Sequence, residues 1–248
     1  RLGWLVLMPG VTDRLIRHIK TENMSVKEVL MVGAMADLLP PEQVLEISQL
    51  LSCPFLNSFG STETGIPPCS AELIVPNSNE FSLSKRQNSF CAVKLVDEDD
   101  NEVPTGTVGE LAIRGPTLFS GYWNSNVGNN KDFRGGWFHM GDVFRRNVDG
   151  TYDFIDRAKY LIKSGGENIY PAEIERVLLE DERVVDAVVV RQIDQQWGEV
   201  PVAVVACNRL SITEDQILAL CRSKLAGYKR PKRVVFAKLT DLPRSTTG

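Results

Sequence analysis

The stretch from Asp156 to Glu175 constrains the fold of this chain more than any other. It begins with a cluster of charged residues, continues through a short apolar piece typical of a strand, and then reaches the glycine pair Gly165-Gly166. Two consecutive glycines allow the backbone to approach another group closely or to move. Pro171 suits the first position of a helix, and the apolar residues after it recur at helical spacing. The run therefore predicts a strand, a glycine loop and a helix.

The composition limits the class of protein. The chain has 248 residues, of which 43% are hydrophobic, and this supplies enough apolar side chains for one large core or two smaller ones. Its net charge of -4 gives no sign of a nucleic acid or an anionic membrane as partner. The sequence has no apolar run long enough to span a bilayer. Five scattered cysteines without a CxxC pair argue against a zinc ribbon or a disulfide framework, and they favour a reducing, cytoplasmic location.

The first part of the chain has the pattern of an α/β fold. Trp4 to Met8 is an apolar, strand-like piece, and Val11 to Thr21 places its apolar residues at helical spacing. Val26 to Val32 is a second strand-like run, after which Pro40-Pro41 opens another helix. Alternating strands and helices predict a sheet whose ligands lie at the carboxyl ends of the strands.

The middle part changes to the pattern of consecutive strands. Ala92 to Val96 and Gly109 to Gly115 are strand-like segments separated by residues typical of turns. Asp149-Gly150 is a hairpin signal between Val143-Phe144 and the segment that begins at Tyr152. These features predict a small antiparallel barrel or sheet.

The last part has the pattern of a separate, small α+β domain. Val184 to Val190 and Val200 to Cys207 are strand-like runs, and Thr213 to Gln216 is a capping box that opens a helix. Between Cys221 and Lys238 the chain carries seven Lys or Arg residues and no Asp or Glu. A solvated face explains such a run most simply, while a patch that attracts phosphate groups is the functional alternative.

A second informative stretch runs from Asn57 to Gly65. Its small hydroxyl residues lie between glycines, so backbone N–H and side-chain O–H groups can surround a phosphate. Glu63 offers a hard oxygen ligand for Mg²⁺, and Phe59 offers a flat ring face to a base. It is not a Walker A loop, because no Gly-Lys-Ser/Thr follows. A surface turn rich in Ser and Thr has the same composition, so this stretch alone leaves both interpretations open.

Together these stretches resemble the adenylate-forming, AMP-binding superfamily. The run that begins at Gly165-Gly166 resembles the hinge and pantetheine-tunnel motif of its acid:CoA ligase branch, and Phe59 to Glu63 resembles its aromatic-Gly-x-Thr-Glu motif. Gly136 to Asp142 resembles a third motif, with Met140 where the family usually has Thr. Tyr160 stands where the commoner family variant has an acid. The matched motifs occur in the family's order over almost the whole chain.

The resemblance implies a nucleotide site for ATP. In it Glu63 binds Mg²⁺, Thr62 contacts phosphate and Phe59 stacks on adenine. Asp142 holds the ribose, and Arg157 contacts ribose or phosphate. The other residues implied to line the nucleotide are Gly33, Ala34, Met35, Ser58, Gly60, Ser61 and Ile155.

The resemblance also implies a moving C-terminal domain. Lys159 is its hinge, Lys163 lies near the site of thioester formation, and both join Thr62 and Glu63 as the implied catalytic residues. The implied channel for coenzyme A is lined by Ser164, Gly165, Gly166 and Glu167. We therefore expect part of an α/β nucleotide-binding subdomain at 1–80, a barrel-like antiparallel β subdomain at 81–157 that completes the large domain, and a hinged α+β domain at 158–248.

The activity implied is that of an ATP-dependent carboxylic acid:CoA ligase. Both ends read as cuts, because Arg1 is not an initiator Met and Thr246-Thr247-Gly248 stop where the family continues into a catalytic Lys. We therefore expect the C-terminal half of a longer enzyme, inactive alone, that needs its missing N-terminal portion as partner. Two alternatives stay open, namely a non-catalytic fragment that binds nucleotide or CoA, and an acyl-AMP ligase that passes the acyl group to a carrier protein.

Overall fold

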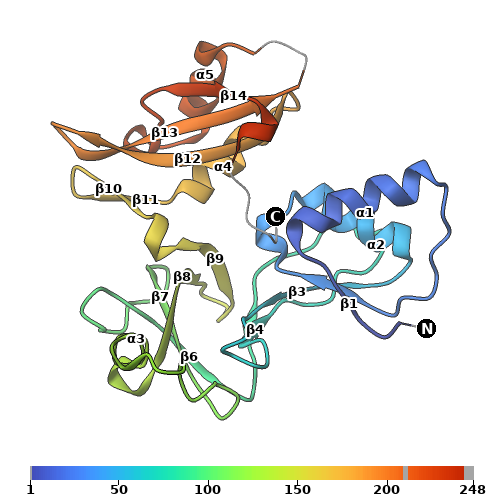
Figure 1. The fold of residues 1–248 in the computed structure, drawn as a ribbon, viewed down its shortest axis with the longest axis horizontal. Helices are drawn as coiled ribbons and strands as arrows, with labels where there is room; N and C mark the ends of the chain where they lie inside the picture. Colours follow the sequence, from blue (N-terminus) through green and yellow to red (C-terminus); the bar gives the residue numbers. More distant parts are fainter. Residues whose placement is uncertain (1, 209–211, 243–248) are drawn as a thin grey trace. The chain divides into compact units, whose positions relative to one another are not determined.

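The computed structural model describes residues 2–208 and 212–242 (Figure 1). Within them the chain forms two compact units. Unit 1 comprises residues 2–140 together with Phe144–Phe154, and unit 2 comprises Gly141–Val143 together with the described residues from 155 to 242. The boundaries expected after residues 80 and 157 remain predictions. Among the described residues, no helix is both long enough and apolar enough to cross a membrane.

Unit 1 begins with a five-stranded sheet of order β1–β2–β3–β4–β5. Strands β1, β2 and β3 pair in parallel, whereas β4 and β5 extend the sheet with antiparallel pairings. Figure 1 shows α1 and α2 on the same side of β1 and β3. The bounds are β1 Leu5–Val6, α1 Pro9–Thr21, β2 Val32–Ala34, α2 Pro41–Leu51, β3 Phe55–Phe59, β4 Cys69–Ser70 and β5 Arg86–Gln87, with a 3-10 turn at Ala36–Leu38.

Helix α2 shows how the sequence pattern becomes packing. Pro41 occupies its first turn, as expected from the sequence, and four side chains of the helix are buried, namely those of Val44, Ile47, Ser48 and Leu51. Val44 and Ile47 are completely buried, in one core cluster with Val32 and Phe55 of the sheet. Each such side chain contributes about 1.5–3 kcal/mol of hydrophobic free energy, so this face fixes the helix on the sheet.

The next four strands form a sheet of order β6–β7–β8–β9. Its ends are β6 and β9, so within the described residues it is an open sheet and not the barrel-like subdomain expected from the sequence. The hairpin predicted at Asp149-Gly150 is confirmed, because Gly150 has a φ of 80° and Oδ1 of Asp149 accepts a hydrogen bond of 3.0 Å from the backbone N–H of Thr151. The bounds are β6 Ala92–Val96, β7 Val108–Arg114, α3 Asn126–Asp132, β8 Phe138–Arg146 and β9 Tyr152–Arg157, with a 3-10 turn at Arg134–Gly136.

Unit 2 contains a further five-stranded sheet and two helices. Its strands lie in the order β11–β10–β13–β12, and β14 pairs in parallel with β13. The capping box predicted at Thr213 is confirmed, since its side chain accepts from the backbone of Gln216 and the Gln216 side chain accepts from the backbone of Thr213. The bounds are β10 Ile162–Ser164, β11 Glu167–Ile169, α4 Pro171–Leu178, β12 Val184–Asp194, β13 Gly198–Cys207, α5 Glu214–Lys224 and β14 Val234–Ala237, with 3-10 turns at Ala158–Tyr160, Gly227–Lys229 and Leu239–Asp241.

The glycine pair adopts a tighter structure than the loop expected from the sequence. Strands β10 and β11 pair antiparallel with Ser164 opposite Glu167, so Gly165 and Gly166 form a two-residue hairpin turn. Both glycines have positive φ, 58° and 87°, which is the requirement of such a turn. Helix α4 then begins at Pro171 as predicted.

Candidate functional site

The carboxyl ends of β2 and β3 lie side by side in unit 1. Ala34, the last residue of β2, is the register partner of Asn57 in β3. The turn that starts at Met35 therefore lies beside the loop that follows Phe59. Ligands of open α/β sheets bind at such an edge, and the sheet brings together two of the segments that the sequence predicts to bind nucleotide.

The loop after β3 is folded by its own hydroxyl groups. The Thr64 hydroxyl accepts a hydrogen bond of 3.0 Å from the backbone N–H of Ser61 and donates one of 2.9 Å to the Ser61 carbonyl. Gly65 has a φ of 68°, and a Cβ there would lie 2.7 Å from the carbonyl oxygen of Thr117. The loop is thus fixed by the Ser61–Thr64 hydrogen bonds and by the close packing of Gly65 on Thr117. The Thr62 side chain remains exposed.

The Ser61 hydroxyl is the observation in this loop that points to a ligand. Its Oγ is buried and has no hydrogen-bond partner among the described residues. A buried hydroxyl without a partner costs about 1–3 kcal/mol, and polar groups of this kind are nearly always satisfied. A phosphate oxygen is an acceptor of the kind that Ser61 lacks, so the chemistry of the loop fits the group predicted for it.

Glu63 fits the role of a protein ligand to Mg²⁺ in a site where substrate phosphates supply other oxygen ligands. Its Oε1 accepts a hydrogen bond of 3.0 Å from the Tyr122 hydroxyl, and its carbonyl accepts one of 2.9 Å from the backbone N–H of Phe119. Within the described ranges, no three or more His, Cys, Asp or Glu side chains are grouped to hold a metal. Mg²⁺ is commonly bound through one or two carboxylates plus substrate phosphates and water, which matches this arrangement.

Phe59 does not present the open ring face that was expected for adenine. It is only 2% exposed, and its ring packs edge-on against Phe144 at 4.7 Å between centroids and more distantly against Phe154. An aromatic side chain at the end of a buried strand packs into the hydrophobic core, and the stacking of Phe59 on adenine remains a prediction. Ser58 and Gly60, its neighbours in the chain, remain at the edge of the sheet.

Gly33 and Met35 also have structural roles. A Cβ on Gly33 would lie 2.7 Å from Nε1 of Trp4, so the glycine is required by packing in unit 1. Met35 packs against the core cluster that contains Phe59. Their predicted contacts with nucleotide, and that of Ala34, remain predictions.

In unit 2, Asp142 and Arg157 lie on neighbouring strands. Asp142 is 4% exposed, and its Oδ1 lies 3.4 Å from Nε of Arg157. The structure thus brings together the two side chains predicted to contact ribose or phosphate. Ile155 is partly buried on β9, two residues before Arg157.

Asp156 links the end of β9 to the start of α4. Its Oδ1 accepts a hydrogen bond of 2.7 Å from the backbone N–H of Arg157, and its Oδ2 accepts one of 2.9 Å from that of Ala172. Ala172 lies in the first turn of α4, where a carboxylate is favoured by the exposed N–H groups. Burial raises the pKa of Asp156 in spite of these hydrogen bonds.

Lys159, the predicted hinge, lies in the 3-10 turn after β9. Its carbonyl accepts a hydrogen bond of 2.7 Å from Arg191 on β12, and its ammonium lies 4.7 Å from the centroid of the Tyr160 ring. Lys163, on β10, is exposed and donates its backbone N–H to Glu199 at 3.0 Å. These contacts place both residues near the surface of unit 2, and their roles remain predictions.

Trp197 is a candidate residue that the sequence reasoning missed. A Cβ on Gly165 would lie 2.6 Å from its ring, and its carbonyl accepts a hydrogen bond of 2.9 Å from the Gly165 backbone. The ammonium of Lys232 lies 5.7 Å from the ring centroid. Trp197 thus lies next to both the Gly165-Gly166 turn and the ammonium of Lys232 in unit 2. The residue is 42% exposed. An aromatic residue followed by glycine was the sequence signal for this site.

The basic stretch after Cys221 divides into structural and exposed cations. Lys229 makes two contacts of 2.7 Å with the carboxylate of Glu173, and Arg230 donates to the carbonyls of Arg222 and Leu225 at the end of α5. Lys232 is exposed and faces Trp197. Lys229 and Arg230 therefore have structural partners, and a phosphate-attracting patch, the functional alternative for this stretch, would rest on the exposed cations such as Lys232.

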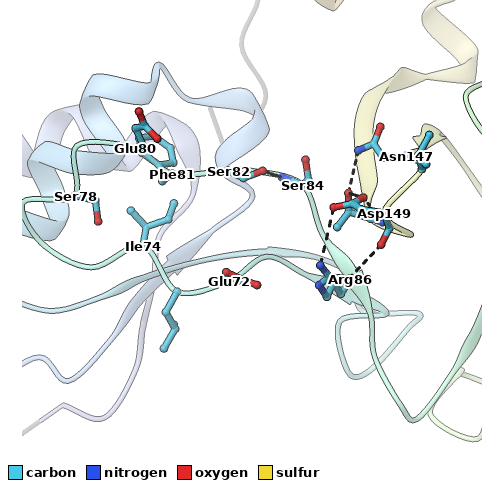
Figure 2. Close-up of a pocket in the computed structure, with 13 residues that line it drawn as sticks. Glu72, Ile74, Ser78, Glu80, Phe81, Ser82, Ser84, Arg86, Asn147 and Asp149 are labelled. Atoms are coloured by element: carbon cyan, nitrogen blue, oxygen red, sulfur yellow. Dashed lines mark hydrogen bonds and ion pairs between the residues drawn. The ribbon is translucent and has the colours of Figure 1, made fainter.

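A cavity of about 640 Å³ lies elsewhere in unit 1 (Figure 2). Arg86 lies at its side, 4.0 Å from Asp149 and 3.4 Å from the Asp149 carbonyl. None of the predicted site residues lines it. We therefore place the candidate site at the sheet edge and not in this cavity.

The segment Thr246-Thr247-Gly248, after which the family resemblance implies a catalytic Lys, lies outside the described residues.

Comparison with known proteins agrees with this geometry. The family model described as AMP-binding enzyme matches residues 1–123, and the model described as AMP-binding enzyme C-terminal domain matches residues 173–248. The chain is 32% identical to indoleacetate–CoA ligase of Aromatoleum aromaticum over 100% of its length and 48% of that protein. It is 35% identical to 2-succinylbenzoate–CoA ligase of Bacillus cereus over 98% of its length and 49% of that protein.

A solved structure has the same fold over almost the whole chain. This is O-succinylbenzoate coenzyme A synthetase from Bacillus subtilis in complex with ATP and magnesium ion, with a TM-score of 0.77 and 26% identity. The match covers 98% of this chain and 49% of that one. The chain thus spans about half the length of the curated relatives it matches.

Proposed function

Because the chain belongs to the AMP-binding enzyme family, we propose that it is the C-terminal half of an AMP-forming carboxylic acid:CoA ligase. In the first step a carboxylate oxygen of the acid attacks the α-phosphorus of ATP, and the bond to pyrophosphate breaks. In the second step the sulfur of coenzyme A, having lost its proton, attacks the acyl carbon of acyl-AMP. The carbon–oxygen bond to AMP then breaks, and AMP leaves with the electron pair.

One observation carries the nucleotide part of the proposal, namely the buried Ser61 hydroxyl in the loop after β3, which has no hydrogen-bond partner within residues 2–208 and 212–242. In the proposed complex Ser61 and Thr62 donate to phosphate oxygens, and the adjoining Ser58 and Gly60 line the nucleotide. Glu63 holds Mg²⁺, which neutralises the charge that gathers on the phosphates when pyrophosphate leaves. The share of this chain in catalysis is thus positioning and charge stabilisation.

Unit 2 supplies the ribose and coenzyme A contacts of the proposal. Asp142, oriented by Arg157, accepts hydrogen bonds from ribose hydroxyls, as a buried carboxylate can. Lys159 is proposed as the hinge, where a change at very few residues moves a whole domain. Lys163 lies close to the channel for pantetheine, whose lining we propose as Ser164, Gly165, Gly166 and Glu167.

Two alternatives remain, and one experiment separates them. Carboxylate-dependent release of pyrophosphate is measured with and without coenzyme A, across short, medium, long-chain and aromatic acids. It is run on this chain and on its gene product extended at both ends. We expect the extended form to release pyrophosphate and, with coenzyme A, to form a thioester, and the best acid identifies the substrate class.

The other outcomes identify the alternatives. Pyrophosphate release without any thioester indicates an acyl-AMP ligase that passes its product to a carrier protein. ATP binding without pyrophosphate release in either form indicates a non-catalytic binding fragment. Glu63→Gln in the extended form is the control for magnesium-dependent turnover, because it keeps the size of the side chain and removes the charge.

A further inference from the structure

A lysine is completely buried beneath the candidate nucleotide loops. Lys85 is 0% exposed, and its ammonium lies 2.5 Å from Oδ2 of Asp37, which is itself 8% exposed. The ammonium also donates to the carbonyl of Leu83 at 3.1 Å. Removing two charges from water costs several kcal/mol per ion, and an apolar pair often serves stability as well or better. Stability alone therefore does not account for this pair.

Asn57 extends the pair into a network of three segments. Its Oδ1 accepts a hydrogen bond of 2.8 Å from the backbone N–H of Ala36, and its Nδ2 donates to Oδ2 of Asp37 at 3.2 Å. The same Nδ2 also donates to the Leu83 carbonyl at 3.0 Å. The turn after β2, the strand β3 and the segment before β5 are thereby joined through three side chains, those of Asp37, Asn57 and Lys85, and two backbone groups. Asn57 itself is completely buried, so water does not compete for these hydrogen bonds.

The network lies directly under the two segments that carry the nucleotide residues. Asp37 follows Met35 by two positions, and Asn57 immediately precedes Ser58. The Lys85 backbone is fixed independently, since its N–H and carbonyl pair with Tyr152 at 2.9 and 2.7 Å. The Lys85 side chain thus joins the two segments to a backbone that is itself paired with β9.

We propose that Lys85 is a positioning residue that sets the spacing between the Met35 turn and the Ser58–Glu63 loop, so that both contact one nucleotide. This inference rests on the proposed function. Lys85 touches no substrate in it and acts only through Asp37 and Asn57. This role requires a side chain that brings a positive charge to the Asp37 carboxylate while its own backbone remains paired with Tyr152.

The test compares a single variant with a double variant. Lys85→Met leaves the Asp37 carboxylate buried without its cation, which is strongly destabilising. The double variant Asp37→Leu/Lys85→Met removes both charges and refills the space with apolar groups, so its melting temperature returns to within a few degrees of the parent. The control is Ile19→Ala in α1, which is 2% exposed and weakens the same unit without touching the network.

Two readouts separate positioning from stability. Hydrogen exchange of the amides at 33–37 and 58–64, measured on this chain, is expected to rise at least about tenfold in the double variant and not in Ile19→Ala. The KM for ATP, measured on whichever form releases pyrophosphate, is expected to rise at least about tenfold in the double variant while kcat changes less, since small misplacements cost this much.

Each outcome decides the inference. If the double variant recovers both its melting temperature and the parental KM for ATP, Lys85 has only a structural role and the inference is overturned. Unchanged exchange at the two loops overturns it as well. If no form releases pyrophosphate, the proposed function fails by itself, and the exchange of the two loops still shows whether the network sets their spacing.

Discussion

The hydroxyl of Tyr122 donates a hydrogen bond of 3.0 Å to Oε1 of Glu63, although 59 residues separate the two in sequence. The backbone N–H of Phe119 binds the Glu63 carbonyl in the same region at 2.9 Å. One segment therefore orients both the side chain and the backbone of the proposed magnesium ligand.

Replacing Tyr122 by Phe removes this hydrogen bond and keeps the ring. A hydrogen bond to a charged group at a partly exposed site contributes about 1 kcal/mol, so we expect the Mg²⁺ concentration for half-maximal pyrophosphate release to rise about fivefold. Trp123→Phe is the matched control, because Trp123 is the next residue and is 98% exposed. An equal change in both variants would mean that the segment as a whole, and not the hydroxyl, affects Glu63.

Replacing Ser61 by Ala separates ligand binding from folding. The buried hydroxyl has no partner in the described part of the chain, so its removal relieves a desolvation cost and we expect the melting temperature to stay the same or rise slightly. The KM for ATP is expected to rise about tenfold, because the phosphate contact is lost. A melting temperature that falls by many degrees with an unchanged KM would show that Ser61 is structural.

Substituting Gly166 tests the proposed pantetheine channel. Gly166 has a φ of 87° and open space around a new Cβ, so Gly166→Leu adds bulk at the turn together with about 1–2 kcal/mol of backbone strain. We expect thioester formation to be blocked and pyrophosphate release to persist. Gly150→Leu is the control, since Gly150 is also in a hairpin turn, has a φ of 80° and has no atom near a new Cβ. Equal loss of both half-reactions in Gly166→Leu would exclude a channel at this turn.

Local signals in the sequence predicted the local structure correctly. Pro41, Pro171 and the Thr213 capping box each begin a helix, and Asp149-Gly150 forms a hairpin. These succeed because a cap or a turn is decided by residues within a few positions of each other.

The contacts between distant residues could not be predicted in this way. Lys85 reaches Asp37 across 48 positions, and a single lysine in a polar segment gives no sign that it will be buried. The burial of Phe59 could not be predicted either, because an aromatic residue in a motif is spelled the same whether its ring faces a base or packs in the core. The packing of Trp197 on Gly165 likewise depends on the pairing of β10 with β13. The sequence thus suggested candidate residues for the site, whereas the contacts that hold these residues in place became visible only in the structure.

The basic stretch after Cys221 is a candidate patch for the phosphate groups of coenzyme A, and substituting Lys232 tests this hypothesis more directly than substituting Arg230. Arg230 donates to carbonyls at the end of α5, so its loss disturbs the fold, whereas Lys232 is exposed beside Trp197. We expect Lys232→Gln to raise the KM for coenzyme A about fivefold and to leave the KM for ATP unchanged, because one phosphate-attracting charge is lost. Lys238→Gln, which removes an exposed charge from the same stretch, is the control. A rise confined to the ATP constant would contradict the assignment.

Glu175 is expected to make the stability of unit 2 depend on pH. Burial raises the pKa of its carboxyl from 4.5 to about 7; the N–H of Val189 opposes this shift, and nearby Asp156 and Asp186 add to it. Because the folded state binds the proton more tightly than the unfolded state, the contribution of Glu175 is greatest below pH 4.5 and is lost as the pH rises to about 7.

Glu175→Gln reproduces the protonated carboxyl and keeps an oxygen that can accept from Val189. We expect this variant to match the parent near pH 4.5 and to exceed its free energy of unfolding by roughly 3 kcal/mol at pH 8, as a shift of this size implies. Urea unfolding at several pH values between these limits measures the difference. Glu182→Gln, which removes a carboxylate from an exposed site in unit 2, is the matched control variant. A pH-independent difference for Glu175→Gln would show that the buried carboxyl keeps its ordinary pKa.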